Sequence, residues 1–69
     1  MPLSMVKTGQ QQLIKKINGK EDIKRFLESL GFAVGGVVTI VSDMGGDLIV
    51  NIKDARIAIS KSVANRIIV

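Results

Sequence analysis

The side chains that could do chemistry in this 69-residue chain are carboxylates, hydroxyls and amines. Six acidic residues and five serines accompany ten lysines and arginines, but the chain has no histidine and no cysteine. Histidine is the side chain best suited to general acid–base work and metal binding near neutral pH, and cysteine supplies the thiolate nucleophile. We therefore expect a protein that is not an enzyme and needs no cofactor.

The spacing of the carboxylates favours structural roles. Glu21 and Asp22 are adjacent, so on a helix they diverge by about 100° and instead suit the positive end of the helix dipole. Asp43 and Asp47 flank a glycine pair, which is typical of a hairpin turn. Two carboxylates without a third oxygen ligand make a poor cation site, so the sequence predicts no metal ligands.

Composition indicates one small domain over residues 1–69. Hydrophobic residues make up 46% of the chain and aromatic residues only 3%, so the core must be aliphatic. The net charge of +4 is spread over separate pairs and single residues, which is typical of a solvated surface or of weak attraction to an acidic partner. No apolar run approaches the roughly 18 residues of a membrane span, and we expect a soluble, cytoplasmic protein.

A helix is predicted to follow Asn18, which we expect to cap it, and to end near Leu30. Its apolar stripe has helical spacing, Gly31 can adopt the left-handed backbone that ends a helix, and we expect both phenylalanines in the core. The stripe consists of Ile23, Phe26, Leu27 and Leu30.

The remaining elements are predicted strands. Ser60 is expected to cap a short helical turn at 61–65, and five glycines are expected at turns or helix ends. Sequential hairpins of this kind predict a mainly β fold, a small barrel that closes on itself. The strands are expected at 37–42, 48–53, 55–60 and 66–69, with one bulged strand at 11–17 and an edge strand or extended lead-in at 3–8; the glycines are Gly9, Gly31, Gly35, Gly45 and Gly46.

The segment Leu27-Glu28-Ser29-Leu30-Gly31-Phe32-Ala33-Val34-Gly35 resembles the signature of the FeoA family, and the order of the later glycines and aliphatic residues agrees with it. Asp54 departs from the family pattern, since a turn glycine is common there. The resemblance implies an SH3-like barrel of five to six short strands, with one inserted α-helix and a short helical turn near the C-terminus. It also implies an accessory, regulatory protein of ferrous-iron uptake that binds the cytosolic GTPase part of the FeoB membrane transporter.

Two surfaces are candidates for partner contact. Strand alternation places Val37, Val41 and Ile49 on the outside of the barrel, where the helix or the termini cover them or they form an exposed patch. At the helix end, Leu27 is the apolar side chain we expect to be displayed, with Lys24 and Arg25 beside it. Packing of Leu27 in the core is the alternative. The partners expected are the transporter and, weakly, a second copy of the chain, with membrane contact only through the transporter.

Two other functions stay open. The chain could be a free-standing relative of the SH3-like domain of iron-dependent repressors, or a small nucleic-acid-binding barrel. Base stacking relies on aromatic side chains, and the chain has no tryptophan or tyrosine, so we expect no specific nucleic-acid binding. The same lack argues against a groove for proline-rich peptides.

Overall fold

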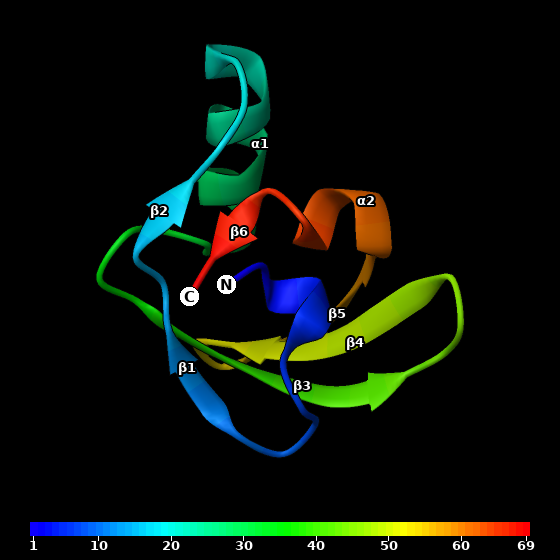
Figure 1. Cartoon of the computed structure of the whole chain (residues 1–69). Helices are drawn as coiled ribbons and strands as arrows, with labels where there is room; N and C mark the ends of the chain where they lie inside the picture. Colours follow the sequence, from blue (N-terminus) through cyan, green and yellow to red (C-terminus); the bar gives the residue numbers. More distant parts are fainter.

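A strongly twisted four-stranded antiparallel sheet, ordered β1-β3-β4-β5, carries most of the structure (Figure 1). A two-stranded sheet, β2-β6, packs at its inner side, and the computed structural model describes all residues 1–69. Neither helix has the length and apolar character needed to cross a membrane. The elements are β1 Gln11–Leu13, β2 Lys16–Ile17, α1 Glu21–Leu30, β3 Val37–Asp43, β4 Asp47–Ile52, β5 Ala55–Ser60, α2 Lys61–Ala64 and β6 Ile67–Ile68, preceded by a 3-10 turn at Leu3–Met5.

The meander β3-β4-β5 forms because its β-branched residues alternate between two faces. Val38, Ile40 and the facing Val50 are buried on the inner face, whereas Val37 and Val41 are exposed on the outer face. The β3-β4 register shifts between Ile40 and Ser42, so the bulge that we predicted in the first strand lies in β3 instead. The predicted bounds of β5 are confirmed, and those of β3 and β4 are right to within one residue.

Helix α1 ends where the sequence predicts. Gly31 has φ of 107°, and its N–H donates to the carbonyl of Glu28, while the N–H of Phe32 donates to Leu27. Glu21 and Asp22 occupy the first turn, at the positive end of the dipole. The N-cap residue is Lys20 and makes no side-chain capping hydrogen bond, so the prediction of Asn18 as the cap is wrong. Phe32 is fully buried, but Phe26 is 53% exposed, so the prediction of a core position for Phe26 is wrong.

The first seventeen residues differ from the prediction. Leu3–Met5 is a 3-10 turn with Leu3 buried in the core, not an edge strand. The predicted single strand at 11–17 is two short strands in different sheets, because the chain changes direction at the buried Ile14. The N–H of Ile14 still donates to Gly36 beside β3, whereas the N–H of Lys15 already donates to Ile68 in β6.

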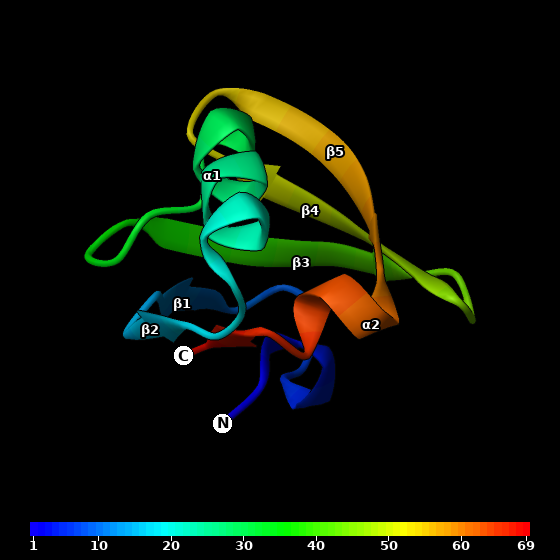
Figure 2. The ribbon, with the colours of Figure 1, turned by 90° about the horizontal axis from the view of Figure 1, so that it is seen from above.

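Helix α2 lies between β5 and the N-terminal 3-10 turn, whereas α1 stands out from the sheets and contributes Leu27 to the core (Figure 2). Ser60 caps α2 as predicted, since its Oγ accepts a hydrogen bond from the N–H of Val63 at 3.2 Å. The mainly β architecture with six strands is confirmed, but the expected closure is wrong: the ladder does not close, because β5 pairs only with β4. One aliphatic core joins both sheets and α1, made of Leu3, Ile14, Ile17, Leu27, Phe32, Val38, Ile40, Leu48, Val50, Ile52, Ile59, Ala64, Ile67 and Val69.

Candidate functional site

The carboxylates are scattered over the surface, and no three of them gather where they could hold a metal ion. Asp43 is the one with a marked environment. Its Oδ1 accepts the N–H of Gly45 at 3.0 Å and lies 3.2 Å from Nζ of Lys61. The Gly45 N–H, with Lys61 second, lowers the pKa of Asp43 below its usual 3.8, although the carboxylate is at the surface. Asp43 therefore fixes the hairpin tip, as the turn chemistry predicts.

The outer face of the four-stranded sheet carries four apolar side chains that are exposed or half-buried, and we call this set the apolar strip: Leu13, Val37, Val41 and Ile49. The paired row of Gln11, Thr39, Asn51 and Arg56 lies between the first two and the last two. Leu13 and Val37 face each other across β1 and β3 and are 52% and 44% exposed. Val41 is 37% exposed at the bulge, and Ile49 is half-buried beside it on β4. No helix or strand covers this face (Figure 1), so the outward positions predicted for Val37, Val41 and Ile49 are confirmed.

Leu13 is the member of the apolar strip that the sequence analysis missed. Its strand has only three residues, and the imperfect alternation at 11–17 did not reveal which side chains share a face. The pairing of Leu13 with Val37 does so, since opposite residues of neighbouring strands project to one side of a sheet.

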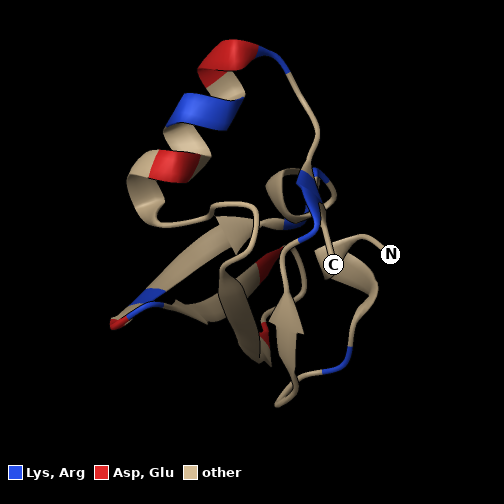
Figure 3. Cartoon of the chain, turned by 90° about the vertical axis from the view of Figure 1, so that its left-hand side faces the viewer, with Lys and Arg blue, Asp and Glu red and all other residues tan.

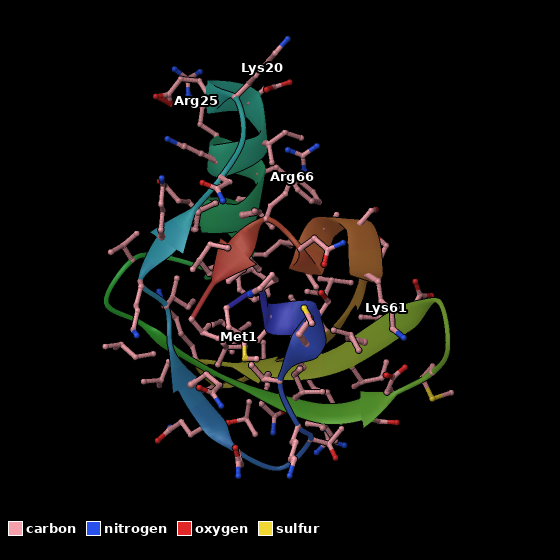
Figure 4. All side chains as sticks on the ribbon, in the orientation of Figure 1. Met1, Lys20, Arg25, Lys61 and Arg66 are labelled. Atoms are coloured by element: carbon pink, nitrogen blue, oxygen red, sulfur yellow. The ribbon has the colours of Figure 1, made fainter.

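The predicted display of Leu27 is wrong. Leu27 is 0% exposed and belongs to the core, and the neighbouring Phe26 takes the exposed position. Successive residues on a helix point about 100° apart, so a small error in the predicted orientation of the helix exchanges the buried and the exposed positions of these two residues. Arg25 projects into solvent at the end of α1 that lies far from the sheets, together with Lys20 (Figure 4).

Lys24, by contrast, takes part in a groove between α1 and the chain on either side of it. This hollow of about 330 Å³ is lined by Lys15, Lys16, Ile17, Lys24, Glu28 and Val34, and we call it the lysine groove. Figure 3 faces this side and shows the basic segments of the helix and of the chain leading to it on one flank of the molecule. The sequence shows the lysines but not their convergence, because three separate segments form the groove.

Comparisons with known proteins agree with this fold over its whole length. The sequence matches the family model of the FeoA domain over residues 1–69. It is 29% identical over 68 residues to a protein of Methanocaldococcus jannaschii that is provisionally named Fe(2+) transport protein A; the match covers 99% of this chain and 83% of that protein.

Solved structures of the same kind superpose closely. The crystal structure of an iron uptake regulatory protein, FeoA, has a TM-score of 0.87 at 29% identity, covering 96% of this chain and 88% of that one. The FeoA of Stenotrophomonas maltophilia, a procaryotic SH3 domain protein solved with zinc, has a TM-score of 0.83 at 28% identity, covering 99% and 87%. A manganese-dependent transcriptional repressor shares the fold over 39% of its own length, with a TM-score of 0.85 at 17% identity.

Proposed function

The chain belongs to the FeoA domain family, and we propose that it acts in ferrous-iron uptake as a non-enzymatic accessory protein that binds the cytosolic GTPase part of a FeoB-type membrane transporter. The proposal places the protein in the cytoplasm. The family and the relative from M. jannaschii support the transport process. The choice of partner rests on the family resemblance and on the exposed surfaces of the molecule.

The apolar strip is the observation that carries the proposal. A small domain that buries fourteen aliphatic and aromatic residues nevertheless leaves Leu13 and Val37 side by side in water, on a sheet face with no covering element. Contiguous exposed apolar side chains of this kind mark contact sites for other proteins. The strip is small, which suits a reversible regulatory contact rather than a permanent subunit interface.

The residue inventory supports a role exerted through contact. Its acidic groups do not converge, and the chain has no histidine or cysteine to activate a serine or to bind iron. An effect on iron transport would then act on the protein that carries the ion. The fold shared with a metal-dependent repressor does not change this assignment, because one fold serves many functions.

Isothermal titration calorimetry with the GTPase domain of the FeoB encoded in the same genome tests the proposal. We expect wild-type protein to bind, and Val37→Lys to weaken binding about tenfold, since a lysine on the strip puts a hydrated charge where an apolar contact forms. Met44→Lys is the matched control: Met44 is also apolar and 66% exposed, but lies at the β3-β4 hairpin tip. Circular dichroism checks that both variants are folded.

Two results would count against the proposal. The absence of binding by the folded wild-type protein would reject the GTPase domain as partner. Binding to oligonucleotides with a steep dependence on salt, together with none to the GTPase domain, would favour the nucleic-acid alternative.

A further inference from the structure

We propose that the lysine groove is the docking site for an acidic segment of the partner protein, one that presents carboxylates to Lys15, Lys16 and Lys24 and an apolar side chain to Val34. The inference deepens the proposed function and rests on it in taking the partner to be a protein.

The groove gathers cations that have no intramolecular partner. Lys61 and Asp43 form the only salt bridge in the structure, so the three groove amines are unpaired, even though Glu28 lines the same hollow. Three amines around one hollow repel one another, and an incoming carboxylate removes that repulsion while forming charge-assisted hydrogen bonds. One glutamate against three lysines leaves the groove with an excess of two positive charges.

The groove also has an apolar side. Ile17 is almost completely buried under it, and Val34 is 65% exposed at its rim. An acidic segment seated in the groove can therefore place an apolar side chain against Val34.

Size and shape favour a peptide segment over other acidic ligands. A volume of about 330 Å³ is at the small end of ligand-binding hollows and suits a few side chains. An anionic membrane is flat and attracts lysines that project from a surface, whereas these lysines surround a concavity. A nucleic-acid duplex needs a longer basic stripe, and only three of the ten lysines and arginines line this groove.

Two charge-matched double variants test the site by calorimetry against the GTPase domain. Lys15→Glu/Lys16→Glu changes the groove, and Lys7→Glu/Arg66→Glu changes exposed cations that lie outside the groove and off the apolar strip. Each substitution removes one positive charge and adds one negative charge, so both doubles lower the net charge from +4 to zero. We expect the groove variant to weaken binding at least about tenfold and the control by less than about threefold. Added salt should weaken wild-type binding more than that of the groove variant.

A second probe makes the test independent of the transporter. NMR titration with a synthetic peptide of glutamates around one leucine should shift the amides of Ile17, Lys24 and Val34 first. If the charge reversals disturb folding, Lys15→Gln/Lys16→Gln serves in both experiments, because it removes the charges without adding carboxylates.

The outcomes separate the two proposals. Equal weakening by both doubles, or none by the groove variant, overturns the groove as docking site and leaves the GTPase domain as partner. If the wild-type protein does not bind the GTPase domain but binds the peptide in the groove, the GTPase domain is rejected as partner and the groove remains a site for acidic peptides. Peptide shifts elsewhere, or binding to phosphatidylglycerol vesicles that only the groove variant loses, overturn the acidic-peptide assignment.

Discussion

Nζ of Lys61, the first residue of α2, lies 3.2 Å from Oδ1 of Asp43, the last residue of β3. The same lysine donates its backbone N–H to the carbonyl of Gly46 in the β3-β4 hairpin at 3.1 Å. Lys61, which follows β5 directly, thus connects the start of α2 to the exposed tip of the β3-β4 hairpin (Figure 4).

Asp43→Asn should destabilise the protein at neutral pH but not in acid. Asparagine keeps an oxygen for the Gly45 N–H and loses the charge that faces Lys61. The folded-state pKa of Asp43 is lowered, so its contribution is complete above the usual value of 3.8 and disappears as the pH falls through the lowered pKa. Thermal melting of both proteins between pH 7 and strong acid measures this. A stability difference that stays constant over the whole range would contradict the role of the charge.

Leu27→Ala should nearly unfold the domain, whereas Leu30→Ala should be milder. Leu27 is fully buried and its truncation leaves a cavity, at a cost of about 2–5 kcal/mol; a domain of this size holds only about 5 kcal/mol in total. Leu30 is half-buried at the edge of the core. Urea unfolding of the two variants measures the difference, and Phe26→Ala is the surface control. A larger loss of unfolding free energy in Leu30→Ala than in Leu27→Ala would contradict this orientation of the helix.

Lys53→Gly should raise the free energy of unfolding by up to about 1 kcal/mol, because glycine adopts the left-handed backbone without the clash of a Cβ atom. Lys53 has φ of 53° in the two-residue turn between β4 and β5, and it is the only residue other than glycine with positive φ. Gly31→Ala is the reverse experiment, since φ there is 107°, and it should lower stability by about 1 kcal/mol. Chemical denaturation measures both, and a loss of stability in Lys53→Gly would refute the strain.

The purified protein should show no tight Fe²⁺ site and no nucleotide hydrolysis. Its carboxylates do not gather, and nitrogen or sulfur ligands of the usual kinds are missing from the sequence. Anaerobic calorimetry with Fe²⁺, with Zn²⁺ as a second metal, and a phosphate-release assay with ATP and GTP test this. A stoichiometric site of sub-micromolar affinity on the monomer would reject it.

Local signals were sufficient to predict α1, the three-strand meander and the Ser60 cap, because periodicity, glycine and capping chemistry act within a few residues. The sequence was insufficient where the structure of a segment depends on contacts with distant parts of the chain. Residues 11–17 divide between two sheets because the N–H of Ile14 donates to Gly36 and the N–H of Lys15 donates to Ile68. Both acceptors are distant in the sequence, so nothing within residues 11–17 indicates this division. The lysine groove likewise depends on the packing of α1 against the chain around it.

The two ends of the chain are joined. The N-terminal amine of Met1 donates to the carbonyl of Val69 at 2.9 Å, the N–H of Val69 donates to Met1 at 2.8 Å, and Pro2 pairs with Ile68. The backbone thus behaves as a ring held together by hydrogen bonds. A short covalent linker between residues 69 and 1 should be tolerated, and a circularly permuted chain opened at the exposed Gly9 turn should fold to the same structure, leaving the lysine groove free of any terminal tag.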